Sequence, residues 1–192
     1  QGWRLEPDDV WLPFQPGQKG PYRYDGRSLY YLKFPKHPLE DEYFAKYPKL
    51  PWSPYELYCV YKDSRGHMWF GTANFGICRF DGKSLDWMYE KHLTEIEGGR
   101  MFGIRSIIED KDGAFWFCNT QYRYRIAPST TSAPGNGLIS YTREKGIELS
   151  DTASDEDFFY FQSVTEDENR DLWMATYGGG VWRYDGKTAT HF

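Results

Sequence analysis

The chain has 192 residues and a formal net charge of −5. This length suits one domain with a sizeable core and is too short for two. The acidic balance argues against nucleic acid or an anionic membrane as a partner, because both favour basic faces. No apolar run approaches the roughly 18 residues that a membrane helix needs, so we expect no membrane insertion. Aromatic residues make up 19% of the chain, which also contains 19 Gly and 11 Pro; this mixture favours short strands separated by turns.

A pattern of tryptophan, glycine-containing loop, arginine beside an aromatic residue, and Asp-Gly turn recurs along the chain. In chain order its copies occupy residues 8–28, 64–84, 111–129 and 169–188. Asp81 follows Trp69 at the same spacing as Asp185 follows Trp173, whereas the first copy has a longer loop and the third lacks the Asp-Gly turn. Units of about 50 residues with several strands each indicate propeller blades.

Each unit divides into four strands, with the tryptophan and arginine strands in the middle. The expected first strands are residues 2–6, 57–63, 104–110 and 161–167. The expected last strands are residues 29–34, 84–90, 138–144 and 188–192. The Asp-Gly turns favour the positive φ of a type I′ hairpin. We therefore predict an all-β fold, a single β-propeller domain over residues 1–192. Its roughly four four-stranded antiparallel blades cover residues 1–36, 53–92, 102–145 and 158–192.

The pattern resembles the two-component regulator propeller repeat, whose units read like V-x-x-I-x-E-D-x-x-G-x-L-W-F-G-T-x-x-G-G-L-x-R-Y-D. The best matches run from Ile107 to Trp116 ("IIEDKDGAFW"), from Trp69 to Asp81, and from Val164 to Gly186. Propellers of this family form extracytoplasmic sensor regions of bacterial signalling proteins, often tied to polysaccharide use. The resemblance therefore implies a binding role and a periplasmic, cell-surface or secreted location. The sequence begins with Gln1 rather than Met, which indicates that an upstream segment has been removed.

The residues that recur in every unit are expected to serve the scaffold. We expect the tryptophans to pack between blades, and the carboxylates of Glu109-Asp110 and Glu166-Asp167 to cap turn amides. The recurring arginines should form structural ion pairs or stack on aromatic rings; they are Arg23, Arg79, Arg125 and Arg183. The three cysteines lack metal-ligand or disulfide spacing and are expected to be buried thiols; they are Cys59, Cys78 and Cys118.

Function is expected where the units differ, on the face of the propeller that carries the two-to-three loops and the blade connections. That variable face is rich in aromatic and polar groups, which suit sugar rings and also suit a protein partner. The candidate ligand-binding residues are Tyr43, Trp52, Tyr55, Phe75, Arg100, Phe102, Tyr122, Arg123, Phe158 and Tyr177. Three residues at one matching position of the innermost strands are candidates for the channel mouth, or for hydrogen bonds between blades; they are Tyr58, Arg105 and Gln162.

Catalysis has little support in the sequence. The four histidines are scattered over unrelated units without metal-ligand spacing; they are His37, His67, His92 and His191. There is no GxSxG elbow, HExxH or P-loop, so no catalytic residue, metal or cofactor is assigned. The favoured function is a non-catalytic module that binds a saccharide or another small polar ligand. The alternative is a protein-interaction or assembly module, and a propeller lyase or hydrolase is the least favoured function.

The chain starts at a first strand and stops at a fourth, which leaves whole blades at both ends. We expect a four-bladed ring that closes by packing of the fourth blade on the first. The alternative is that two chains join into an eight-bladed ring, so both a monomer and a dimer remain open.

Overall fold

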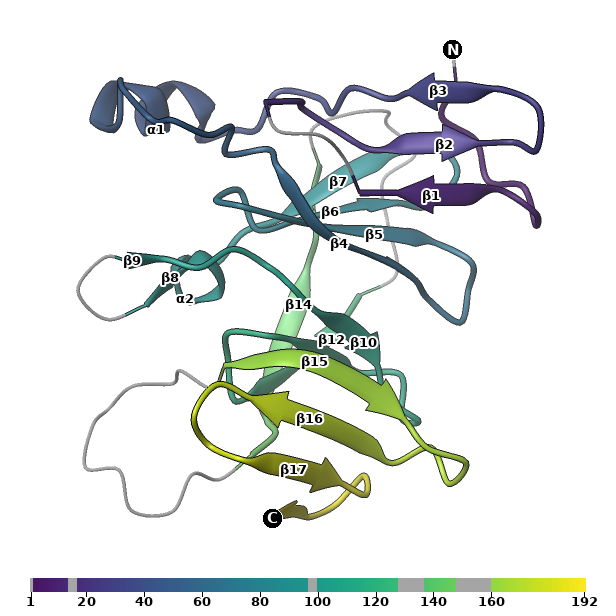
Figure 1. The fold of residues 1–192 in the computed structure, drawn as a ribbon, viewed down its shortest axis with the longest axis vertical. Coiled ribbons are helices and arrows are strands. Elements are labelled where there is room, and N and C mark those ends of the chain that lie inside the picture. The colour runs from purple at the N-terminus through teal and green to yellow at the C-terminus, as the bar shows by residue number, and fades with distance from the viewer. Residues whose placement is uncertain (1, 14–16, 97–99, 128–136, 148–159) are drawn as a thin grey trace.

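The computed structural model describes the whole chain except residues 1, 14–16, 97–99, 128–136 and 148–159. For residues 91, 92, 95, 96, 100 and 101 it describes the backbone alone. Four antiparallel sheets lie one behind another along the longest axis of the molecule (Figure 1). This arrangement confirms the predicted all-β fold of about four antiparallel blades.

The first two sheets do not have the expected four strands: blade 1 has three and blade 2 has five. Blade 1 has the order β1-β2-β3, with β1 (Val10–Leu12), β2 (Tyr22–Tyr24) and β3 (Leu29–Tyr31). Blade 2 contains β4 (Leu57–Lys62), β5 (Met68–Thr72), β6 (Ile77–Phe80) and β7 (Leu85–Met88). A fifth strand, β13 (Gly137–Leu138), arrives from the third unit and pairs with β7 in parallel.

The other two sheets have four strands each. Blade 3 contains β10 (Ile107–Glu109), β11 (Phe115–Phe117), β12 (Tyr122–Ile126) and β14 (Tyr141–Lys145). Blade 4 contains β15 (Phe161–Glu166), β16 (Leu172–Thr176), β17 (Val181–Tyr184) and β18 (Ala189–His191). The blade connections contain α1 (Glu40–Lys46), α2 (Lys91–Thr94), β8 (Glu95–Ile96) and β9 (Arg100–Met101).

The expected strand over residues 2–6 is wrong. Those residues form no strand, and blade 1 has three strands as a result. Trp3 and Leu5 instead pack into the core between blades 1 and 2. Trp3 lies 5.9 Å from Trp11 and 5.1 Å from Phe80 between ring centroids. Burial of these side chains against the face of blade 2 takes the place of pairing with β1.

One aspartate organises the turn between the first and second strands of blades 2, 3 and 4. Asp110 accepts hydrogen bonds from the amides of residues 112 and 114 and, at 2.9 Å, from Nε1 of Trp116. Asp63 and Asp167 make the same three bonds, with Trp69 and Trp173 as the indole donors. The predicted capping is confirmed for Asp110 and Asp167, whereas Glu166 pairs with Arg170 instead. The shared bonds explain why an aspartate precedes the tryptophan by six residues in these three blades.

The Asp-Gly turns are capped in a similar way. In the turn of blade 2, Asp81 Oδ1 accepts hydrogen bonds from the amides of Lys83 and Ser84. Gly82 has a φ of 92°, and no other residue of this turn has a positive φ. A type I′ turn needs two consecutive residues with positive φ, so that prediction is wrong.

The recurring tryptophan of each blade lies directly opposite an arginine on the next strand. Trp69 pairs with Arg79, and Arg79 forms a 3.0 Å ion pair with Asp86 in the buried interior. In blade 3 the partner of Trp116 is Arg123, not the predicted Arg125. The third unit lacks the Asp-Gly turn that anchored the other alignments, which shifted the predicted arginine by two positions. Arg123 lies 3.4 Å from Asp110 and is the structural arginine of this blade.

Three apolar cores lie between successive blades. The first includes Trp11, Phe70 and Phe80, the second Trp69 and Phe115, and the third Trp116, Tyr184 and other side chains of blades 3 and 4. The predicted packing of tryptophans between blades is therefore confirmed for these three interfaces. Cys78 and Cys118 are buried as expected, and Cys59 is half-buried.

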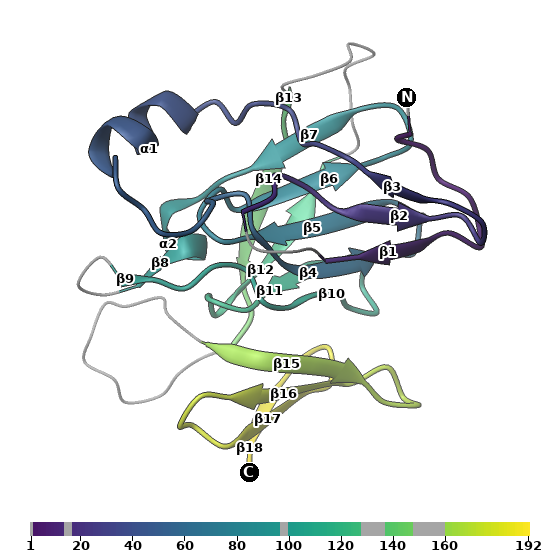
Figure 2. The same ribbon diagram turned by 45° about the horizontal axis from the view of Figure 1, so that its top comes forward.

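The ring expected to close within one chain is wrong. Blades 1 and 4 lie at opposite ends of the molecule in both ribbon views (Figures 1 and 2). In the part of the chain that the structure describes, each apolar core joins neighbouring blades, and none joins blade 4 to blade 1. Successive packing of the four sheets produces an open arc.

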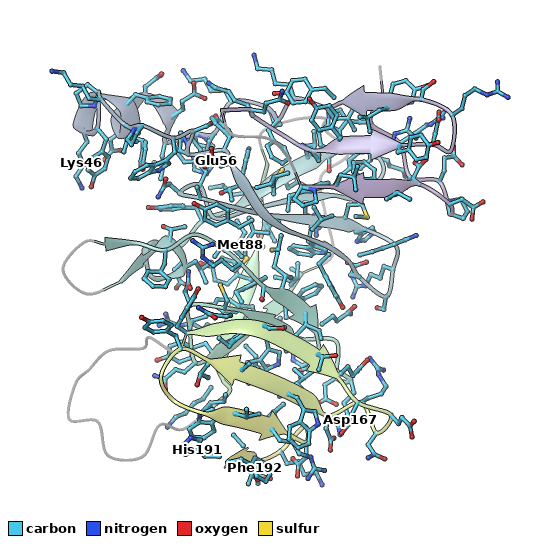
Figure 3. The ribbon with its side chains drawn as sticks, viewed as in Figure 1. Lys46, Glu56, Met88, Asp167, His191 and Phe192 are labelled. Atoms are coloured by element: carbon cyan, nitrogen blue, oxygen red, sulfur yellow. The ribbon has the colours of Figure 1, made fainter. Side chains whose placement is uncertain are left out.

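The two ends of the strands differ in what they carry. The short turns β4–β5 and β15–β16 lie on one side of the arc, which we call the turn end (Figure 1). The helices α1 and α2 lie on the opposite side, which we call the connection end. Glu56, directly before β4, lies toward the connection end, and Asp167 lies at the turn end (Figure 3).

Candidate functional site

Three predicted channel-mouth residues lie in a row at the connection end. Tyr58 is the extra residue where β4 shifts register between Leu57 and Cys59. Gln162 is the extra residue of the corresponding shift in β15, between Phe161 and Ser163. Bulges of this kind re-aim a side chain and leave the residue unpaired in the ladder. The two residues therefore hold equivalent positions in their blades, and their role at a channel mouth stays a prediction.

Arg105 occupies the matching position in blade 3, two residues before β10 begins. Its guanidinium carbon lies 4.3 Å from the centroid of the Tyr58 ring, which brings blades 2 and 3 together at the row. On the other side, Ser106 Oγ donates a 2.9 Å hydrogen bond to the backbone carbonyl of Gln162. The expected alternative of bonding between blades is therefore present beside the row. The side chains of Arg105 and Gln162 are exposed.

Gly103 allows the ring of Tyr58 to lie close to the backbone of the segment before β10. Its φ is 65°, in the left-handed region, and a Cβ at this position would overlap the ring of Tyr58. Such a Cβ would also lie 3.1 Å from Cα of Ala73. Only glycine fits both conditions without strain, so this residue sets the floor beneath the row.

Aromatic side chains extend the row toward blade 4. Phe102 and Tyr160 pack edge to face with ring centroids 4.5 Å apart, and Tyr177 lies 6.3 Å from Tyr160. Tyr177 is 74% exposed, so its ring is available to a ligand. Burial raises the pKa of Tyr160, while the Arg105 charge and a hydrogen bond with Gln162 oppose that rise. We call Tyr58, Arg105, Gln162 and Tyr177 the inner-strand row.

A second group of predicted residues surrounds α1 and is largely buried. Tyr55 and Phe75 are each only 1% exposed, so neither ring lies open to solvent as the sequence analysis expects. Phe75 stacks on His37 with ring centroids 4.4 Å apart. The hydroxyl of Tyr55 donates to Glu40 of α1 and accepts a 2.7 Å bond from the amide of His37. These two aromatic residues hold the connection on blade 2.

Two other residues of this region lie nearer the surface. Tyr43 is half-buried and packs 5.2 Å from Phe75 between ring centroids. Trp52 is 40% exposed, and its indole Nε1 donates a 3.0 Å hydrogen bond to Asn74 Oδ1. The bond orients the indole and leaves part of its ring open to solvent.

A pocket of about 570 Å³ lies where β3, α1 and blade 2 meet. It is lined by Lys19, Lys33, Phe34, Pro35, Lys36, Glu40, Tyr55 and Leu85. Lys19 lies 3.5 Å from Glu40, and Lys36 forms a 2.6 Å ion pair with Asp41. The sequence pattern does not reveal this pocket, because its lining residues come from separate segments that only the fold brings together.

The remaining predicted residues lie apart from the row. Tyr122 is half-buried in β12, where the guanidinium of Arg143 lies 4.2 Å from its ring centroid. Arg123 lies in the same strand and faces Asp110, so its expected position on the variable face is wrong. Phe158 lies outside the described residues, as does the side chain of Arg100. Tyr160 was missed by the sequence analysis, although its place directly before a first strand is a usable signal.

The part of the chain that the structure describes has neither a cluster of metal-binding side chains nor a membrane-spanning helix. No group of three or more His, Cys, Asp or Glu side chains there could hold a metal ion. No helix there combines the length and apolar character required to cross a membrane.

Comparisons with known proteins agree with this architecture. Residues 51–74 match the sequence model of the family described as two component regulator propeller. No curated protein sequence matches the chain. Two solved structures of the extracellular domain of BT4673 from B. thetaiotaomicron, named a hybrid two component system in one and a one component system in the other, are similar in fold. Their TM-scores are 0.57 and 0.54, with 19% and 20% sequence identity.

Each comparison covers 98% of this chain but 21% of the BT4673 chain, so the chain spans about a fifth of that domain's length. Identity at this level speaks for the fold alone. The family match covers blade 2 from its entering connection to the end of β5 and the residues that follow. The resemblance noted in the sequence is thereby confirmed: the chain carries a two-component regulator propeller repeat within a propeller-like array of four blades.

Proposed function

We propose that the chain is a non-catalytic, extracytoplasmic sensor-type module that binds a saccharide or similar small polar ligand on the inner-strand row. The observation that carries the proposal is that one equivalent position in three blades holds Tyr58, Arg105 and Gln162. Neighbouring positions in the same strands hold the buried residues that the fold requires. Residues that differ on a rigid, repeated frame are candidates for recognition.

The chemistry of the row suits a polar ring. Tyr177 supplies a flat face against which the C–H surface of a sugar can stack, whereas the ring of Tyr58 holds the Arg105 guanidinium in place. Arg105 and the Gln162 amide supply donors and an acceptor for hydroxyl or carboxylate groups. The lysine-lined pocket offers a second place for a ligand.

The location outside the cytoplasm rests on two points. The chain shares its repeat with a family of extracytoplasmic sensors, and BT4673 is described as an extracellular domain. Whether the protein is periplasmic, on the cell surface or secreted is left open by this proposal.

Titration of the protein with a panel of neutral and acidic oligosaccharides tests the proposal. Binding is monitored by tryptophan fluorescence and by the melting temperature. Ligand at about a hundredfold over its Kd should stabilise the fold by roughly 2.7 kcal/mol. The proposal predicts a saturable response that falls at least about tenfold in affinity in Arg105→Ala, because one charge-assisted bond contributes about 1.5 kcal/mol. Lys33→Ala, on the separate pocket, is the matched control and should bind like the wild type.

Other outcomes have clear meanings. A response lost in Lys33→Ala but kept in Arg105→Ala would move the site to the pocket and contradict the row. A flat response over the whole panel would contradict saccharide binding and favour the alternative of a protein-interaction module.

A further inference from the structure

His37 joins the connection between blades 1 and 2 to blade 2. Its ring is 1% exposed and stacks on Phe75, with ring centroids 4.4 Å apart and an angle of 6° between the planes. The ring also packs on Trp87 of β7 at 4.8 Å and on Tyr89 at 5.7 Å, in both cases edge to face. Because α1 begins three residues after His37, the position of this ring places the helix against blade 2.

His37 also organises the start of α1. Its carbonyl accepts a 3.0 Å hydrogen bond from the amide of Glu40, and its Nδ1 accepts a 3.1 Å bond from the amide of Leu39. Leu39 is the N-cap residue, and its own side chain makes no cap bond. The amide of His37 donates a 2.7 Å bond to the hydroxyl of Tyr55. The first turn of the helix therefore depends on both the ring and the main chain of His37.

The bond from Leu39 determines where the neutral ring carries its proton. A ring nitrogen that accepts a hydrogen bond has no proton of its own, so the proton lies on Nε2. Nε2 is buried and has no hydrogen-bond partner among the residues that the structure describes. A second proton would have to bind at Nδ1, where it would face the Leu39 amide and remove its acceptor. Charging the ring therefore breaks the bond at the helix start and leaves a charged N–H group buried without an acceptor.

The titratable groups that face the ring come from three elements. In the described part of the chain they are Glu40 of α1, Tyr55 before β4 and Tyr89 after β7. Glu40 attracts a charged ring, but its two oxygens already interact with the Tyr55 hydroxyl and with Lys19, which lies 3.5 Å away. Burial lowers the pKa of His37 to about 4, and the charge of Glu40 opposes that shift only in part. The surroundings therefore favour the neutral ring.

α1 can leave blade 2 without taking the blades apart. None of its residues is buried, and in both ribbon views it projects beyond the ends of the strands (Figures 1 and 2). The apolar core between blades 1 and 2 has contacts of its own, such as Trp11 with Phe70 at 5.6 Å and with Phe80 at 6.4 Å. A segment with little buried surface opens at a lower free energy than the whole fold.

We propose that His37 is an acid-sensitive switch, in which protonation of the ring releases residues 37–47 from blade 2 while the four sheets stay folded. The open form uncovers the rings of Phe75 and Trp87, which His37 covers in the docked form. It also removes Glu40 from the wall of the lysine-lined pocket. The acidity of the medium thereby controls access to this side of blade 2. The switch does not depend on saccharide binding at the inner-strand row.

The direction of the effect follows from the two pKa values of His37. In the released segment the ring regains its ordinary pKa of about 6.5, whereas the docked ring has a pKa of about 4. The open form therefore binds the proton more readily, and the docked form loses stability as the pH falls from about 6.5 toward 4. With these two values the equilibrium constant for opening rises about seventyfold between pH 7.5 and pH 4.5.

Hydrogen exchange of the intact chain, measured at pH 7.5 and pH 4.5 by mass spectrometry, tests the proposal. The reporters are the amides of Tyr43 and Tyr47, which donate to the carbonyls of Leu39 and Tyr43 in the docked helix. After correction for the intrinsic exchange rate at each pH, protection of these amides should fall about seventyfold at the lower pH. Unchanged protection would overturn the proposal.

Low concentrations of urea separate local release from unfolding of the whole chain. Local opening exposes little surface, so urea should leave the exchange of the α1 amides unchanged at both pH values. Exchange of the paired amides of β5 and β6 requires larger unfolding and should accelerate with urea. If the α1 amides accelerated with urea in parallel with those strands, the helix would be lost only with the fold, and the switch would be refuted.

Three variants identify the titrating group. His37→Gln should show the same protection at both pH values, because the amide side chain does not titrate. Tyr55→Phe removes the hydroxyl that links His37 to Glu40, so it should lower protection at both pH values and keep the seventyfold ratio between them. His191→Gln changes an exposed histidine of β18 and is the matched control, which should respond like the wild type. A wild-type pH response in His37→Gln, or a ratio near one in Tyr55→Phe, would contradict the proposal.

Discussion

The turn end and the connection end of the strands belong to the same repeat, but the turn end is alike between blades and the connection end varies. At the turn end, Asp63, Asp110 and Asp167 bind their turn amides and the following tryptophan in the same way. At the connection end, the equivalent positions on the inner strands hold Tyr58, Arg105 and Gln162, which share no chemistry. A residue that recurs in every blade is used by the fold, and one that changes between blades is free to recognise a partner.

The largest effect is expected at the turn end. Asp110 is 2% exposed and accepts hydrogen bonds from two backbone amides and the Trp116 indole. Asp110→Ala leaves these donors buried without an acceptor and should lower the free energy of unfolding by about 3 kcal/mol. Urea denaturation measures the loss. Asp112→Ala is the control, because Asp112 lies in the same turn but has a half-exposed side chain, and it should lower the free energy of unfolding by less than about 0.5 kcal/mol. Equal losses in the two variants would show that the hydrogen bonds of Asp110 do not stabilise the fold.

A pH-dependent effect of intermediate size is expected at His37. Burial lowers the pKa of His37 from 6.5 to about 4, and the charge of Glu40 opposes that shift only in part. The unfolded chain therefore binds the proton more readily, and stability is lost as the pH falls from about 6.5 toward 4. The loss from this group between pH 6.5 and 4.5 is about 2 kcal/mol.

His37→Gln removes the titrating group and tests this expectation. Denaturation of the variant at both pH values should give a drop smaller by that amount than in the wild type. The same pH dependence in both proteins would mean that His37 is not held neutral by its burial against Phe75 and Trp87.

A smaller loss of stability is expected at the floor of the inner-strand row. Gly103→Ala places a Cβ against Tyr58 at a φ of 65°, which should cost about 1 to 2 kcal/mol. The substitution should also displace the Tyr58 ring and weaken ligand binding. Gly113→Ala is a useful comparison, because its φ of 76° carries the same backbone strain while its nearest neighbour lies 3.7 Å away. Equal effects of the two substitutions on ligand affinity would show that the contact of Gly103 with Tyr58 does not matter for binding.

Much of the fold could be predicted because its signals are local. The Trp-to-Arg spacing and the Asp-Gly turns identify the tryptophan and arginine strands. In blade 3 the Asp-Gly turn is absent, and the prediction named Arg125 where the structure has Arg123 opposite the tryptophan. The connections were less predictable. Tyr55 and Phe75 have the composition of a binding surface, but packing of α1 and His37 buries them. Whether a loop aromatic faces solvent depends on tertiary contacts that no repeat pattern encodes.

The most direct test of the difference between scaffold and recognition residues replaces one arginine of each kind by alanine. Arg79 is 4% exposed and ion-paired with Asp86, whereas Arg105 is exposed on the row. Unfolding free energy and affinity for a ligand from the oligosaccharide panel are measured for both variants. We predict that Arg79→Ala costs about 3 kcal/mol of stability and leaves affinity unchanged. Arg105→Ala should cost less than about 0.5 kcal/mol and lower affinity at least about tenfold. Wild-type affinity in Arg105→Ala, or wild-type stability in Arg79→Ala, would contradict the division between scaffold and recognition.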